Sequence, residues 1–181
     1  LLDKAAGPRN FLDDTNAAPR SKVSGIAFGS SDEIWLSVPG KGLQHGEFAD
    51  QGWSTILLPA LGQSVSCVTA NGRWVASGAR QFSRRFLFQT SGGNHSRFVG
   101  GVAIRQPKSG EWKSFSLAEG LPNDSVSALA LDGNNLWVGG AGFIAVIDLE
   151  QHKMIRVCTY RGREVDTLRI HGGYVWAGIE K

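Results

Sequence analysis

Four arginines alternate with four phenylalanines in one stretch of the chain, ARQFSRRFLFQTSGGNHSRFVGG, which runs from residue 79 to residue 101. A guanidinium group binds anionic groups through paired hydrogen bonds and also stacks on aromatic rings. The stretch could therefore bind an anionic partner, such as an acidic glycan, by charge and stacking. The candidate ligand-binding residues in it are Arg80, Arg84, Arg85, Phe86 and Arg97.

A structural interpretation of the same stretch is equally open at this point. In it, the phenylalanines Phe82, Phe86, Phe88 and Phe98 pack onto the domain while the arginines stay in solvent. Two further arginines, Arg161 and Arg163, would add to the same surface, or would form a solvated turn. A protein partner is the alternative to an anionic or glycan ligand.

Other kinds of chemistry lack the residue spacing that they need. The histidines, His45, His95, His152 and His171, are too far apart along the chain to resemble metal ligands. Asp132 and Asn134 lack the alternating ligands and the distal glutamate of a calcium loop. The glycines at 139–142 follow a predicted strand without opening a helix, so they do not form a dinucleotide loop, and no nucleophile elbow is present. The sequence therefore predicts no catalytic residue, metal or cofactor.

A repeat organises the elements that would carry the arginines. Its best copy is VSALALDGNNLWVGGAGFIAVIDL, residues 126–149, which predicts three antiparallel strands joined by tight turns at Asp, Gly and Asn residues. Shorter copies begin at Val23, Val65 and Val165. The tryptophans of the copies are 39, 63 and 39 residues apart, at positions 35, 74, 137 and 176, which indicates one insertion in a regular repeat. We expect these four tryptophans to occupy equivalent positions and to fill the gaps between units.

A period of about 40 residues with about four short strands is typical of β-propeller blades. The predicted strands of the first blade are 23–28, 34–38, 42–48 and 53–58, and those of the second are 65–70, 73–78, 101–106 and 112–117. The third blade has strands at 126–131, 136–139, 143–148 and 153–160, and the fourth has two, at 165–170 and 174–179. We therefore predict an all-β segment of about four blades, three complete and the fourth truncated, that belongs to a larger propeller of seven or so blades.

The repeat also resembles the two-component regulator propeller repeat. The resemblance rests on V-S-x-(apolar)-x-x-D-G-N-x-L-W-V-G and G-L-P-N-D-S-V, both within residues 110–148. It implies a non-catalytic ligand-binding or sensing module in the periplasm or outside the cell. It implies no catalytic residues, because the repeat residues of that family are packing and turn positions. A protein interaction scaffold and a propeller-type lyase or hydrolase are the alternatives.

Composition sets the remaining limits. The net charge of +3 comes from 19 basic and 16 acidic residues without a concentrated basic stripe, which does not favour nucleic acid binding. No apolar run reaches the roughly 18 residues that cross a bilayer. We expect residues 1–20 to be a linker or one remnant strand, residues 21–181 to form the blades, and residues 79–100 to be an insertion. An open strand edge invites pairing, so self-association through the last blade is expected.

Overall fold

A computed structural model describes residues 22–30, 32–47, 52–56, 58, 61, 64–80, 100–106 and 109–179. The predicted linker at 1–20 lies outside the described residues. So does most of the insertion, with Arg84, Arg85, Phe86 and Arg97 in it.

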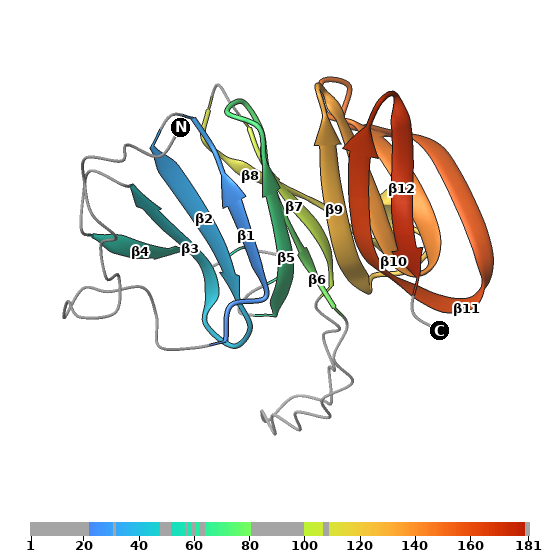
Figure 1. The fold of residues 1–181 in the computed structure, drawn as a ribbon, viewed down its shortest axis with the longest axis horizontal. Coiled ribbons are helices and arrows are strands. Elements are labelled where there is room, and N and C mark those ends of the chain that lie inside the picture. The colour runs from blue at the N-terminus through green and yellow to red at the C-terminus, as the bar shows by residue number, and fades with distance from the viewer. Residues whose placement is uncertain are drawn as a thin grey trace, which may run out of the picture.

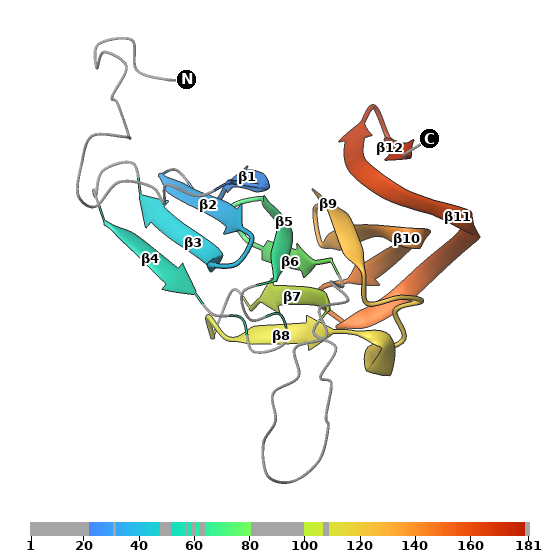
Figure 2. The same ribbon diagram turned by 90° about the horizontal axis from the view of Figure 1, so that it is seen from below.

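The described residues form three antiparallel sheets of four strands each. The first sheet is ordered β1 (Gly25–Phe28), β2 (Glu33–Val38), β3 (Gly42–Glu47) and β4 (Trp53–Ile56). The second is ordered β5 (Val65–Ala70), β6 (Val75–Ala79), β7 (Gly101–Arg105) and β8 (Trp112–Phe115). The third is ordered β9 (Val126–Asp132), β10 (Asn135–Asp148), β11 (Lys153–His171) and β12 (Tyr174–Ile179). The sheets fan out side by side in an arc, with β1, β5 and β9 along its concave side (Figures 1 and 2).

The third sheet contains the third blade and the two predicted strands of the fourth. The first part of β10 pairs with β9, and its second part, from Ala141 on, pairs with β11. The two ends of β10 lie side by side, because the Leu149 amide donates to the Asn134 carbonyl at 2.9 Å. β10 is therefore a hairpin that contains both predicted strands. β11 pairs with β10 up to Glu164 and with β12 from Val165 on, so one continuous strand is the outer strand of blade three and the inner strand of blade four.

The strand predicted at 112–117 was too long by two residues. β8 ends at Phe115, and Leu117–Glu119 form a short 3₁₀ helix, η1. A capping box explains the change of structure: the Ser116 side chain accepts a hydrogen bond from the Ala118 amide, and the Glu119 carboxylate accepts one from the Ser116 amide at 2.7 Å.

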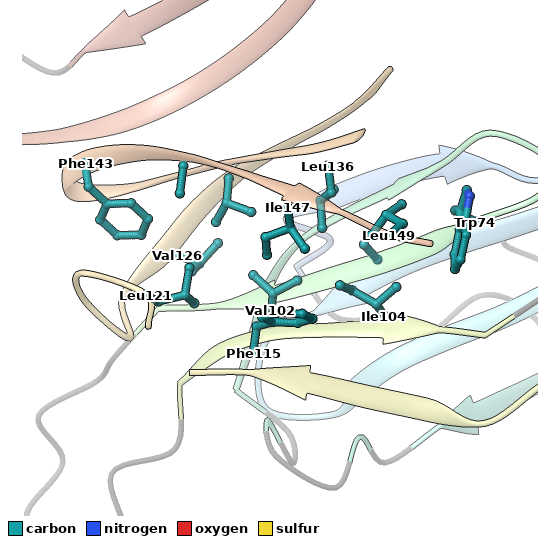
Figure 3. Packing of buried hydrophobic residues seen from close by; sticks show 13 residues of the cluster. Trp74, Val102, Ile104, Phe115, Leu121, Val126, Leu136, Phe143, Ile147 and Leu149 are labelled. Carbon is teal, nitrogen blue, oxygen red and sulfur yellow. The ribbon is translucent and has the colours of Figure 1, made fainter. Parts of the chain in front are cut away.

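The largest hydrophobic core lies between the second and third sheets (Figure 3). Alternating strand residues point into it from both sheets, as the period of two in a strand requires. Its members include Val102, Ile104, Phe115, Val126, Leu136, Phe143, Ile147 and Leu149, all almost completely buried. Each such side chain stabilises the fold by about 1.5–3 kcal/mol relative to an exposed one. A second core, around Trp35, Leu43 and Leu58, joins the first sheet to the second.

Neighbouring blades meet through a repeated contact between a valine and a glycine. A Cβ atom added to Gly78 of β6 would lie 2.6 Å from Cγ1 of Val126, which begins the inner strand of the next blade. A Cβ atom added to Gly139 would lie 2.7 Å from Cγ1 of Val165. Glycine is therefore required at both positions because the next valine occupies the space of a side chain.

A serine next to the valine adds a hydrogen bond at the same contact. Ser66 donates to the Val126 carbonyl at 2.8 Å, and Ser127 donates to the Val165 carbonyl at 2.7 Å. Backbone carbonyls at a blade junction would otherwise be left unsatisfied, which is costly when they are buried. The V-S pair thus ties the second blade to the third and the third to the fourth. In the first blade, Ser24 instead donates to the Ser37 carbonyl of its own sheet at 3.1 Å.

The prediction that four tryptophans are equivalent was wrong for Trp74. Three of the tryptophans have equivalent partners on the neighbouring inner strand: Trp35 pairs with Ala27, Trp137 with Ala130 and Trp176 with Arg169. At the same position of the second sheet the residue is Ala76, which pairs with Thr69. The hairpin at Asn71 is shorter and puts Trp74 two residues earlier. There its Nε1 donates to Asn134 of the next blade at 3.0 Å.

Trp176 also departs from the prediction that these side chains fill gaps between blades. Trp35 and Trp74 are buried and Trp137 is half-buried, but Trp176 is 63% exposed on β12. The reason is that no described blade covers the outer side of β12. The outer-strand tryptophans, Trp53 and Trp112, are half-buried, and Trp112 meets the Trp35 ring edge to face at 6.2 Å.

Candidate functional site

One end of the sheets carries the predicted arginines that the structure describes. We call this end the loop face and define it by Arg80, Pro122, Ala141, Gly142 and the β11 residues Thr159 to Glu164. It holds an open pocket of about 450 Å³, lined by Pro122, Ala141, Gly142, Thr159, Tyr160, Arg163 and Glu164. The pocket lies where the link from β8 to β9, the turn of the β10 hairpin and the middle of β11 meet.

The turn of the β10 hairpin shapes one wall of the pocket. Gly142 has a positive φ of 77°, a conformation that glycine adopts without strain. A Cβ atom at Gly140 would lie 2.1 Å from the Ser125 carbonyl oxygen, so only glycine lets the hairpin approach the link into β9. The glycine-rich segment that the sequence showed at 139–142 therefore serves close packing beside the pocket.

Arg80 binds two carboxylates of β11. Its Nε lies 3.2 Å from Oε1 of Glu164, and its Nη2 lies 3.2 Å from Oδ1 of Asp166. These ion pairs tie the end of β6 in the second blade to the inner strand of the fourth. They are partly exposed, so each contributes about 1 kcal/mol or less. Among the predicted binding residues, Arg80 thus has a structural contact that the sequence did not reveal.

Arg161 and Arg163 follow Tyr160 in β11 and are both exposed. Arg163 lines the pocket, next to the Glu164 that binds Arg80. Arg80 and Arg163 therefore adjoin the same glutamate, although residues 161–163 belong to the continuous strand β11 and do not form the expected turn. The charged groups of the loop face are three arginines, Arg80, Arg161 and Arg163, and the Glu164 carboxylate, and Asp166 follows on the same strand.

Tyr160 lines the pocket, and its hydroxyl oxygen is buried. Within the described residues this oxygen has no hydrogen-bond partner. Burial raises the pKa of the Tyr160 hydroxyl, and the nearby Cys158 and Glu164 add to this effect. The hydroxyl therefore keeps its proton through the neutral range.

Sequence reasoning missed Tyr160, Glu164 and Asp166 at this site. The segment RGREVD, residues 161–166, has two basic residues followed by two acidic ones, and this closeness of opposite charges is the signal that could have indicated ion pairs. Pro122 and Thr159 carry no signal of their own, because their role depends on which chain segments meet in space.

The described histidines belong to separate environments. Nε2 of His45 lies 3.7 Å from Oε1 of Glu33, and the His45 ring lies against the Trp35 ring. Nε2 of His152 lies 2.6 Å from Nε2 of the Gln106 side chain. Burial lowers the pKa of His152, and Lys113 contributes to the shift. Among residues that the structure describes, no group of three or more His, Cys, Asp or Glu side chains is placed to hold a metal ion.

The two cysteines are free. Cys67 lies on β5, an inner strand, and Cys158 lies on the outer half of β11. Burial raises the pKa of the Cys67 thiol to about 11, against a smaller opposite effect of the Ser66 hydroxyl. Cys158 is exposed.

No family model matches the chain, and no curated protein matches it. The described residues form no helix with the length and hydrophobicity needed to cross a bilayer.

Solved structures do match. The computationally designed Ika4 protein is 17% identical to the chain with a TM-score of 0.65, and the match covers 90% of this chain and 91% of Ika4. The extracellular domain of the hybrid two component system BT4673 from B. thetaiotaomicron is 14% identical with a TM-score of 0.67, covering 92% of this chain and 20% of that one. The WD40 repeats of RRP9 are 14% identical with a TM-score of 0.62, covering 84% and 43%. The chain thus spans less than half of the BT4673 and RRP9 chains. At these identities the likeness is one of fold, and the chain is an all-β propeller segment.

Proposed function

We propose that the chain is a non-catalytic ligand-binding module whose ligand binds at the pocket of the loop face. The observation that carries the proposal is the pocket itself. It combines an open volume of about 450 Å³ with a cation at Arg163 and a proton donor at Tyr160. Binding sites are typically concave, with a few polar groups that fix the orientation of the ligand.

The groups that line the pocket favour an anionic, hydroxyl-rich ligand such as an acidic glycan. The Arg163 guanidinium lines the pocket, and its positive charge favours a carboxylate or a sulfate. The hydroxyl groups of Thr159 and Tyr160 can exchange hydrogen bonds with sugar hydroxyls. Pro122 and the Tyr160 ring supply apolar surface on which the C–H groups of a sugar can pack. Arg80 compensates the charge of Glu164 from the side, which leaves the pocket less repulsive to an anion.

The resemblance to the two-component regulator propeller repeat supports a sensing role and a periplasmic or extracellular location. BT4673, whose extracellular domain shares the fold, is a two component system. In this proposal the pocket lies between blades three and four, so a bound ligand would contact the segment that connects them. The candidate residues Arg84, Arg85, Phe86 and Arg97 would extend the same binding surface.

Titration calorimetry with a defined heparin oligosaccharide tests the proposal, with a neutral dextran oligosaccharide of similar length as the second ligand. Arg163→Ala should weaken heparin binding about tenfold or more, because one charge-assisted hydrogen bond contributes about 1.5–3 kcal/mol. Arg169→Ala removes the same charge from an exposed position elsewhere on β11 and should leave binding unchanged.

Two further variants separate the groups of the site. Tyr160→Phe should weaken binding of either saccharide if its hydroxyl donates to the ligand. The double variant with Arg84→Ala and Arg85→Ala tests whether the insertion takes part. The proposed site would be refuted if Arg163→Ala and Tyr160→Phe both bound heparin as tightly as the unmodified chain and kept its melting temperature.

A further inference from the structure

Arg80 differs from the other charged groups of the loop face because it comes from another blade. It directly follows β6 of the second blade, whereas its partners Glu164 and Asp166 lie on β11, the latter 86 residues further along the chain. The Arg80 Nε lies 3.2 Å from Oε1 of Glu164, and its Nη2 lies 3.2 Å from Oδ1 of Asp166. The guanidinium therefore divides its donors between two carboxylates of one strand.

The two carboxylates differ in their relation to the pocket. Glu164 lines the pocket beside Arg163, whereas neither Asp166 nor Arg80 is part of its lining. The Glu164 side chain is 23% exposed, while those of Arg80 and Asp166 are 41% and 45% exposed. Arg80 thus acts on the pocket from outside, through the less exposed of the two carboxylates that it binds.

The charges in the pocket wall show what this contact does to an anion. Arg163 attracts an anionic group, and the carboxylate of Glu164 next to it repels one. Water screens the charge of Glu164 incompletely, because screening is weaker for partly buried groups. The paired guanidinium of Arg80 cancels most of that charge at the distance of a bound ligand. Without Arg80, the wall would contain one positive group and one uncompensated negative group.

We propose that Arg80 determines the charge specificity of the pocket, by neutralising Glu164 so that anionic saccharides bind more tightly than neutral ones. This inference rests on the proposed function, because it names a residue that selects the ligand of the same site. Arg80 is a positioning residue that acts through Glu164 and needs no contact of its own with the ligand. Asp166 binds the other side of the guanidinium and holds it in place.

A purely structural role for Arg80 leads to a different expectation. The same ion pairs tie the second blade to β11, so their loss could simply displace the pocket wall. In that case heparin and neutral dextran would lose affinity by the same factor. If the charge of Glu164 is what matters, only the anionic saccharide loses affinity.

Titration calorimetry of Arg80→Ala with the heparin and dextran oligosaccharides separates the two roles. Heparin affinity should fall about three- to tenfold, because an uncompensated carboxylate repels a nearby anion across a partly solvated wall. Dextran affinity should stay the same. Arg80→Lys should keep most of the heparin affinity, since the ammonium group restores a positive charge beside Glu164. Asp166→Asn is the matched control: it removes the other ion pair of Arg80 but leaves Glu164 compensated, so heparin affinity should not fall.

A second change in the same chain identifies Glu164 as the group through which Arg80 acts. Arg80→Ala combined with Glu164→Gln has neither the guanidinium nor the carboxylate, so the ion pair stays broken while the repulsion is gone. Its heparin affinity should return to about that of the unmodified chain. Circular dichroism and melting temperatures check that every variant folds.

Three results would overturn the role of Arg80. They are a heparin affinity unchanged in Arg80→Ala, an equal loss for heparin and dextran, and a failure of Glu164→Gln to restore heparin binding. Each of them, together with weaker heparin binding in Arg163→Ala, removes the role of Arg80 and leaves the pocket intact. Unchanged heparin binding in Arg163→Ala and Tyr160→Phe refutes the pocket itself, and the role of Arg80 with it.

Discussion

Replacing Gly139 with alanine tests whether the contact between valine and glycine holds the blades together. The added Cβ atom would lie 2.7 Å from Cγ1 and 2.9 Å from Cβ of Val165. Real Cβ atoms do not approach other atoms so closely, and Cβ of Val165 is fixed to its main chain. The blades must therefore shift apart, or β11 must move.

Two effects of opposite sign set the size of the change. Alanine is favoured over glycine in a strand by roughly 0.5–1 kcal/mol, because glycine loses more conformational freedom on folding. Inserting a methyl group into a packed contact costs about 1–3 kcal/mol. Since the clash involves an atom that cannot rotate away, we expect the second effect to dominate and the free energy of unfolding to fall by about 1–2 kcal/mol.

A double-mutant cycle with Val165→Ala gives the test its specificity. Val165 is fully buried, and losing its two methyl groups should cost about 2 kcal/mol. The double variant should be more stable than the sum of the single effects predicts, by about 1 kcal/mol, because alanine at 165 leaves room for the new methyl group.

The unfolding free energies follow from urea titration monitored by tryptophan fluorescence. Gly178 has the same register and no described neighbouring blade, but a Cβ atom added there would lie 2.6 Å from Cγ2 of Thr167 in its own sheet. The matched control is therefore the Gly178→Ala substitution made in a Thr167→Ala chain, which removes that methyl group. It should change stability by less than about 0.5 kcal/mol. A Gly139→Ala chain as stable as the unmodified one, or strictly additive effects in the cycle, would refute the role assigned to the contact.

Three other outcomes are expected. Iodoacetamide should label Cys158 in the folded chain and Cys67 only after unfolding, as mass spectrometry would show. Because the folded-state pKa of Cys67 is raised from 9.0 to about 11, the unfolded chain loses the proton first as pH rises. The stability that the protonated thiol contributes should therefore be fully present below pH 9 and be lost between pH 9 and 11, and Cys67→Ala should remove this loss. Ser66→Ala should cost about 1 kcal/mol in urea titration by removing its bond to the Val126 carbonyl, whereas Ser66→Thr should retain it. The pKa of Glu119 is lowered, mainly by its bond to Ser116. The ionised carboxylate should therefore stabilise the fold above pH 4.5, and this contribution should be lost as the pH falls below 4.5. Glu119→Gln should flatten the acidic part of a plot of melting temperature against pH.

The sequence predicted the strands well because both periodicity and turn chemistry point the same way. β12 occupies the predicted range, and β5 does too, since hairpin residues such as Asn71-Gly72 bound the strands on one side. The alignment by tryptophans failed at Trp74 because a tryptophan is conspicuous in sequence while the length of a hairpin is not. The valine at positions 65, 126 and 165 is the more reliable marker, since it is buried against the preceding blade.

The candidate site was predicted less completely. Arg163 was a candidate because of its type and its place between two predicted blades, and the structure places it in the wall of the pocket. The arginine pattern alone did not indicate that Arg80 is held by carboxylates. The pocket depends on three segments that approach one another only when the blades stack. Tyr160 looked like an ordinary strand residue, because nothing in its sequence neighbours reports that its hydroxyl is buried.

The continuity of β11 has a consequence for how the chain tolerates change. In most propellers, as in other folds, a surface connection can gain or lose residues at little cost. Here the segment from Tyr160 to Val165 joins the part of β11 that pairs with β10 to the part that pairs with β12. Shifting a strand by one residue turns its side chains to the opposite face. An insertion in this segment would therefore expose the buried side chains of β11 in one of the two blades. The same segment lines the pocket. A molecule that binds there therefore contacts the backbone that fixes the register of both blades, and a displacement of that backbone in one blade also displaces it in the other.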